Sequence, residues 1–169
     1  ALEADIKPKN YSVEILGTPK NQLLQRLHRL LFFLDFGKMQ YYKKLADYDL
    51  VISHFYPMNW LAYKAKKHFK VKYFYFNHGI NTEELGSPLQ KVYMKLFSFF
   101  NNITLKNVDE AFSVSKYVQQ SLKKESGIDS KVVYNKIDTQ KFNPKVSGDK
   151  IRKKYNIQSK KVLLYVGRI

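Results

Sequence analysis

The sequence contains no cysteine, so neither a disulfide framework nor a thiolate metal site can form. Its longest apolar run, residues 30–34, is far shorter than the roughly 20 residues that span a bilayer. The first residues also lack the basic-then-apolar layout of a secretory signal. We therefore expect a protein of a reducing, cytoplasmic compartment that does not cross a membrane.

Acidic residues are also scarce. The 14 Asp and Glu residues stand against 30 Lys and Arg residues, which gives a formal net charge of +16. This excess attracts anionic partners such as nucleic acid, phospholipid head groups or phosphorylated substrates, and it does not determine the fold. With 44% hydrophobic and 15% aromatic residues, the 169-residue chain has a globular composition and the length of one domain with a core.

Short apolar runs alternate with longer amphipathic stretches along the chain. The predicted strands are 11–16, 50–53, 71–76, 111–114, 132–134 and 162–166. The predicted helices are 21–46 with an interruption at Gly37, 57–69, 89–105, a segment capped by Ser115 and ended by Gly127, and 150–155. This order predicts an α/β fold, in which a parallel sheet is covered by helices on both faces.

Polar side chains follow three of the predicted strands, namely His54, His78 and Asn135. Ligands of parallel α/β sheets bind in the crevice at the carboxyl ends of the strands. An imidazole that precedes a glycine, as His78 does, can point into this crevice and hydrogen-bond a hydroxyl of a ligand. A loop histidine that bonds only to backbone is the alternative. His28 and His68 lie among helical lysines, arginines and leucines, and we expect both at the surface.

Five segments, taken in order, resemble the family 4 glycosyltransferases, whose two Rossmann-like domains form the GT-B architecture. They are DYDLVISH (47–54), YFYFNHG (73–79), DEAFSVS (109–115), NKID with FNP (135–138 and 142–144) and LLYVGRI (163–169). Lys136 stands where the family has a glycine. The resemblance implies an α/β, Rossmann-like parallel sheet flanked by helices, which is the N-terminal half of a GT-B enzyme.

The resemblance also implies roles for individual residues. His78 would be catalytic, beside the transferred sugar. The acceptor or the sugar would be contacted by His54, Asn77 and Gly79. The donor phosphates would be contacted by Gly167 and Arg168. The turn between the domains would be shaped by Asn135 and Asp138. The implied reaction is transfer of a hexose, with retention, from a nucleotide-diphosphate sugar to a lipid-linked or polysaccharide acceptor. Neither a metal nor another cofactor is expected.

The resemblance further implies a division of the chain into three parts. Residues 1–144 would form the acceptor domain without its first strand and glycine-rich loop, 145–160 an interdomain segment, and 161–169 the first strand of a donor-binding domain. We therefore expect this chain to be part of a longer enzyme and to be inactive alone.

Two basic amphipathic stretches, 25–44 and 89–106, raise the question of membrane contact. A basic helix with an aromatic face can lie in an anionic interface, which predicts a peripheral position on the inner face of a membrane. A core-facing apolar stripe with a solvated lysine face explains the same pattern.

Two other function classes stay open. The charge of +16 and the 13 tyrosines suit a nucleic-acid-binding module, although no RRM, KH or zinc-finger pattern is present and we expect no nucleic-acid partner. A related GT-B enzyme, such as a sugar-nucleotide epimerase, would share much of the pattern.

Overall fold

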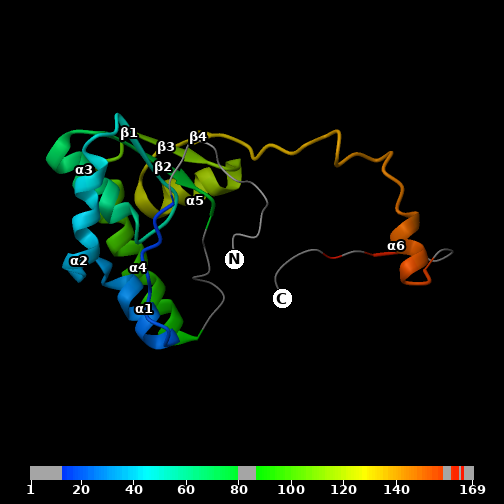
Figure 1. Ribbon diagram of the computed structural model, residues 1–169, viewed down its shortest axis with the longest axis horizontal. Coiled ribbons are helices and arrows are strands. Elements are labelled where there is room, and N and C mark those ends of the chain that lie inside the picture. The colour runs from blue at the N-terminus through cyan, green and yellow to red at the C-terminus, as the bar shows by residue number, and fades with distance from the viewer. Residues whose placement is uncertain (1–12, 80–86, 158–160, 164, 166–169) are drawn as a thin grey trace. The chain divides into compact units, whose positions relative to one another are not determined.

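The computed structural model describes residues 13–79, 87–157, 161–163 and 165. Their helices and strands alternate as the sequence predicts (Figure 1). In chain order the elements are α1 (Gln22–Leu30), η1 (Phe32–Leu34), α2 (Phe36–Met39), η2 (Gln40–Leu45), β1 (Leu50–Ser53), α3 (Asn59–Phe69), β2 (Lys72–Asn77), α4 (Pro88–Leu105), β3 (Glu110–Ser113), α5 (Lys116–Ser126), β4 (Lys131–Val132) and α6 (Asp149–Lys154).

The chain divides into two compact units, Ala1–Tyr134 and Asn135–Ile169. All four strands belong to the first unit, and α6 belongs to the second. The strand predicted over 162–166 falls partly outside the described residues, so its assignment to a donor-binding domain stays a prediction. None of the described helices is both long and apolar enough to span a bilayer.

The four strands form one parallel sheet in the order β1-β2-β3-β4. This confirms the predicted fold class, a Rossmann-like parallel sheet flanked by helices. Each connection moves one strand in the same direction, and such connections are right-handed, so α3, α4 and α5 fall on one face of the sheet (Figure 1). The expectation of helices on both faces is therefore not met within the described residues.

Burial of the strand residues follows this one-sided arrangement. Tyr73 and Tyr75 of β2 are buried beneath the helices, as is Ala111 of β3. On the opposite face Ile52 is 51% exposed. There the rings of Phe74, Phe76 and Phe112 pack on one another, with centroids 5.6 and 5.9 Å apart across the two strands. Side chains alternate between faces along a strand, so this apolar row follows directly from the sequence.

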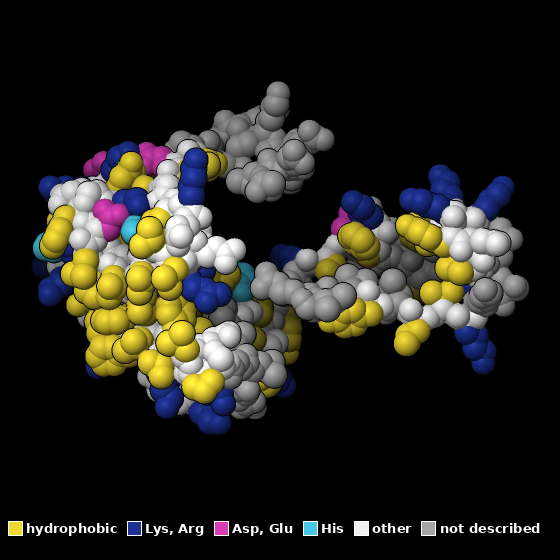
Figure 2. Space-filling model, turned by 90° about the horizontal axis from the view of Figure 1, so that it is seen from below, with side chains coloured by type: hydrophobic (Ala, Val, Ile, Leu, Met, Phe, Trp, Pro, Cys, Tyr) yellow, Lys and Arg dark blue, Asp and Glu magenta, His cyan; other side chains and the backbone are white. Residues whose placement is uncertain are grey.

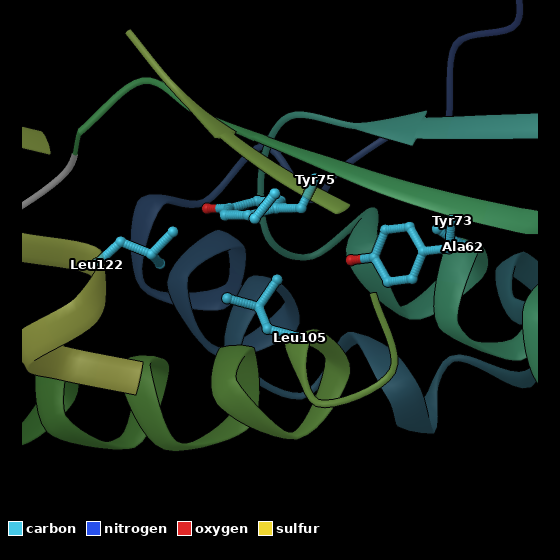
Figure 3. Close-up of a cluster of buried hydrophobic side chains, with 6 residues drawn as sticks. Ala62, Tyr73, Tyr75, Leu105 and Leu122 are labelled. Atoms are coloured by element: carbon cyan, nitrogen blue, oxygen red, sulfur yellow. The ribbon is translucent and has the colours of Figure 1, made fainter. Parts of the chain in front are cut away.

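The core lies between the sheet and the three helices that follow its strands. Ala62, Tyr73, Tyr75, Leu105, Ala111 and Leu122 form its central cluster. In Figure 3, Leu105 of α4 lies beneath the two tyrosine rings, and Leu122 of α5 lies near the hydroxyl end of Tyr75. Leu105 at the end of α4 and Leu122 within α5 thus pack against β2, and the candidate site begins where this strand ends.

The helix predicted over 21–46, with an interruption at Gly37, is instead four short elements, and Gly37 lies inside one of them, α2. Asn21 caps α1, but the helix ends at Leu30, and Asp35 then starts α2 by accepting a hydrogen bond from the backbone N–H of Lys38 at 3.0 Å. An aspartate side chain that binds nearby backbone competes with continuous helix. The Ser115 and Gly127 predictions are confirmed as the caps of α5, while residues 13–16 form no strand.

Candidate functional site

Two histidines meet at the carboxyl ends of neighbouring strands. His54 follows β1 and His78 follows β2, and because β1 and β2 are parallel and paired, the residues after them lie side by side. Nδ1 of His54 is 2.9 Å from Nε2 of His78. Phe55 also stacks on His78, with ring centroids 5.3 Å apart. His78 therefore contacts both an imidazole and an aromatic ring.

The histidine pair can share one proton between its facing nitrogens. One nitrogen must donate and the other accept, so the pair is intact only while at least one ring is neutral. Partial burial lowers the pKa of His54, and the nearby His78 lowers it further. His54 therefore stays neutral to a lower pH than a free histidine, and it can accept from His78 or donate to it.

A tight turn directly after β2 holds His78 in place. The side-chain oxygen of Asn77 accepts a hydrogen bond from the backbone N–H of Gly79 at 3.0 Å. Gly79 has a φ of +81°, a conformation that glycine adopts without steric cost. A Cβ added at Gly79 would lie 2.8 Å from Cγ2 of Val118 on α5. The turn is therefore packed directly against α5, and only glycine fits there.

Gly79→Ala is expected to lower the free energy of unfolding by about 2 kcal/mol, because it adds both left-handed strain and a clash with Val118. Chemical denaturation monitored by circular dichroism measures this loss. Gly127→Ala is the matched control, because Gly127 has a similar φ of +74° but open space around an added Cβ. Equal losses in the two variants would show that packing against α5 contributes nothing.

A cavity of about 310 Å³ opens beside His78. Asn77, His78 and Gly79 form its strand-end wall, Phe55 and Tyr56 line it from the segment after β1, and most of the other lining residues come from α4 and α5. The polar side chains that these helices contribute are Ser98, Asn101, Asn102, Tyr117, Ser121 and Glu125. The cavity is thus lined by hydroxyl, amide and carboxylate groups together with aromatic rings. Such a lining is suited to binding a polyhydroxylated ligand.

The sequence reasoning missed the helical wall of this cavity. On α4 the signal was present, since Ser98, Asn101 and Asn102 lie three and four residues apart among aromatic and aliphatic residues. Uncharged polar residues at that spacing share one face, and here the face points into the cavity. Tyr117 and Ser121, four residues apart on α5, give the same signal.

A buried chain of hydrogen bonds orients Asn101. The hydroxyl of Ser53 donates to Oδ1 of Asn59, and Nδ2 of Asn59 donates to Oδ1 of Asn101 at 2.7 Å. Asn59 is fully buried. Buried amides with satisfied partners have one preferred orientation, so the Nδ2 group of Asn101 is left to face other partners.

Of the predicted strand-end residues, His54, Asn77, His78 and Gly79 come together. His54 contacts His78 but does not itself line the cavity. Asn135 and Asp138 belong to the second unit, where Oδ1 of Asp138 accepts from the backbone N–H groups of Gln140 and Lys141 at 2.9 and 3.1 Å. Gly167 and Arg168 lie outside the described residues.

The two helix histidines differ from each other. His68 is exposed, as predicted. His28, also predicted at the surface, is only 18% exposed, and its Nε2 lies 2.9 Å from Oδ2 of Asp35. The bend at Asp35, which the helical periodicity did not reveal, places the carboxylate against the ring. Across the described part of the chain, three or more His, Asp or Glu side chains nowhere gather as a metal site would require.

The fold defines a class of protein, a Rossmann-like α/β unit, and a cavity with polar side chains opens at its strand ends. A family comparison adds the family, because the model of Glycosyltransferase Family 4 matches residues 3–141. The chain belongs to this family. No curated protein matches the chain.

Proposed function

We propose that this chain is the acceptor-side half of a retaining hexosyltransferase, which moves a sugar from a nucleotide-diphosphate donor to a lipid-linked or polysaccharide acceptor. In this reaction an acceptor hydroxyl replaces the nucleotide diphosphate at the anomeric carbon, and the configuration there is kept. His78 contacts the reacting sugar, and the cavity beside it receives the acceptor end.

The observation that carries this proposal is the joint placement of His78 and the cavity. Its imidazole contacts His54 and Phe55, and the Asn77–Gly79 turn holds its backbone. The cavity offers several neutral hydrogen-bonding side chains around the same ring. Such groups bind sugar hydroxyls without the desolvation cost of buried charges.

The donor's diphosphate requires positive charge as the glycosidic bond to it breaks. We assign this task to Gly167 and Arg168, since a backbone N–H and a forked guanidinium suit phosphate oxygens. The reaction that we propose uses no metal and no cofactor. Measurement of sugar transfer by the complete enzyme in the presence of EDTA tests whether a metal is needed.

Incubation of the complete enzyme with radiolabelled nucleotide-diphosphate hexoses and membrane lipid extract is the direct experiment. The expected result is a labelled glycolipid or polysaccharide that retains the anomeric configuration of the donor, as read by nuclear magnetic resonance. Absence of both transfer and hydrolysis across the common nucleotide hexoses would contradict the proposal.

The proposal includes a membrane-facing surface formed by α1 and α4. These helices contact each other and expose apolar side chains between 44% and 80%, namely Leu23, Leu27, Leu89, Val92, Leu96 and Phe99. Figure 2 shows hydrophobic side chains gathered on this face, with Lys and Arg side chains nearby. Arg26 on α1, with Lys91 and Lys95 on α4, supplies positive charge. An exposed apolar face with positive charges beside it favours binding to the surface of an anionic bilayer.

Binding to vesicles tests this surface. We expect the protein to co-sediment with vesicles that contain phosphatidylglycerol, and the double variant Leu89→Glu/Phe99→Glu to bind about 10-fold more weakly, because charge at the centre of the face opposes insertion. Tyr48→Glu, at an exposed tyrosine of the first unit outside α1 and α4, is the control. Equal binding of wild type and double variant would remove the membrane from the proposal.

A further inference from the structure

His54 contacts the ring of His78 without lining the cavity beside it. Nδ1 of His54 lies 2.9 Å from Nε2 of His78, and His54 is not among the described residues that form the cavity wall. Direct contact with a ligand in that cavity therefore does not explain the placement of His54. Any influence of His54 on a reaction in the cavity passes through the ring of His78.

Aromatic rings hold the two imidazoles in this arrangement. Phe76 of β2 contacts both of them, with ring centroids 5.7 Å from His54 and 5.3 Å from His78. Phe55 stacks on His78 as well, with centroids 5.3 Å apart. Rotation of either imidazole would give up part of this ring packing. The packing therefore favours the contact between Nδ1 of His54 and Nε2 of His78.

The surroundings of His54 leave its Nδ1 without a charged competitor for His78. A cavity of about 330 Å³ borders His54, and its other described lining residues carry no charge: Leu45, Val51, Ile52, Ser53, Phe55, Met58, Leu61 and Ala62. Partial burial lowers the pKa of His54, and the nearby His78 lowers it further. His54 is therefore neutral near neutral pH, and its Nδ1 can accept a hydrogen bond from Nε2–H of His78.

The proposed reaction decides which form of His78 is useful. A sugar gains positive charge as the bond to its leaving group breaks, so a neutral imidazole beside it is favoured over an imidazolium. A neutral imidazole has one N–H and one nitrogen with a free lone pair. When Nε2 of His78 carries the hydrogen and donates it to His54, the lone pair is on Nδ1. This tautomer can accept a hydrogen bond from a sugar hydroxyl.

We propose that His54 is a positioning residue, which accepts a hydrogen bond from Nε2–H of His78 and so holds that ring as the neutral tautomer whose Nδ1 accepts from a hydroxyl of the reacting sugar. Histidines at functional sites are commonly oriented through their second nitrogen in this way. The inference rests on the proposed function and deepens it, because it assigns the nitrogen of His78 that meets the sugar. It also gives His54 a role other than direct contact with acceptor or sugar.

Nuclear magnetic resonance of this chain with ¹⁵N-labelled histidine tests the tautomer. In the wild type near neutral pH, long-range ¹H–¹⁵N spectra should show His78 as a single tautomer with the hydrogen on Nε2. In His54→Phe, which keeps a ring against Phe76 but removes Nδ1, His78 should exchange between both tautomers. A wild-type His78 with its hydrogen on Nδ1, or the same single tautomer in both proteins, would overturn the inference.

Kinetics of the complete enzyme test the consequence for the reaction. His54→Phe should lower kcat about 10-fold, the loss that follows removal of one hydrogen bond, and should leave KM for donor and acceptor within about twofold of wild type. His54→Asn should recover most of this loss, because its amide oxygen is as many bonds from Cβ as Nδ1 is and can accept from His78. Circular dichroism shows whether each variant is folded.

His68→Phe is the matched control, because His68 also contacts aromatic rings, those of Tyr42 and Phe69, but lies outside the cavity. It should transfer sugar at the wild-type rate. Equal rates in His54→Phe and His54→Asn would reject the positioning role, as would a rise in KM without a fall in kcat. Absence of transfer and hydrolysis by the wild-type enzyme would instead reject the proposed function, whereas the tautomer of His78 is measured independently of any reaction.

Discussion

His78→Ala is expected to lower the rate of sugar transfer by the complete enzyme roughly 100-fold, the size of effect that follows loss of one well-placed hydrogen-bonding group. The imidazole is fixed by His54 at 2.9 Å and lines the cavity that would hold the reacting sugar. Alanine removes the ring and leaves the turn, because the Asn77–Gly79 hydrogen bond uses neither the ring nor the backbone of residue 78. Initial rates at saturating donor and acceptor measure the effect.

His68→Ala is the control for this substitution, since His68 is exposed on α3 and lies outside the cavity. It should leave the transfer rate unchanged. Both variants should unfold within about 1 kcal/mol of wild type, because neither removes a fully buried side chain. A transfer rate in His78→Ala within twofold of wild type would remove His78 from the reaction.

Leu105→Ala is expected to lower the free energy of unfolding by about 3 kcal/mol, the middle of the range for leucine truncation in a packed core. Leu105 is the last residue of α4, has no exposed surface, and contacts the tyrosines of β2 (Figure 3). Truncation would leave a void between α4 and the sheet that the rigid tyrosine rings cannot fill. Urea unfolding, followed by far-ultraviolet circular dichroism, measures the change.

Leu96→Ala provides the comparison on the same helix. Leu96 is 44% exposed, so the same chemical change removes little buried surface and should cost less than 1 kcal/mol. A similar loss in both variants would mean that burial of Leu105 beneath the sheet adds nothing to the stability of the first unit.

The strands and their ends were predictable because they depend on local pattern. The apolar runs before His54 and His78, and the glycine after His78, place both histidines at one edge of a parallel sheet. Register then brings the two rings within hydrogen-bonding distance. The caps at Ser115 and Gly127 are equally local, since each depends on the conformational preferences of one residue.

The rest of the site depends on how helices rotate and bend, which periodicity does not specify. The cavity beside His78 is completed by Asn101 and Tyr117, whose helices are set by packing against β2 and against each other. The chain also turns at Asp35 rather than continuing as one helix. The sequence shows Asp35 but not whether it interrupts the helix. That outcome depends on the contacts of its carboxylate with His28 and Lys38, which form only in the folded chain.

The order of the strands in space, β1-β2-β3-β4, is also their order along the chain. Every strand therefore finds its partner one connection away, and the loops that must close are short. As a polypeptide leaves the ribosome, each completed strand–helix segment can add to an edge that has already formed, without waiting for distant segments. Assembly of the first unit is thus expected to proceed stepwise during synthesis, from β1 towards β4.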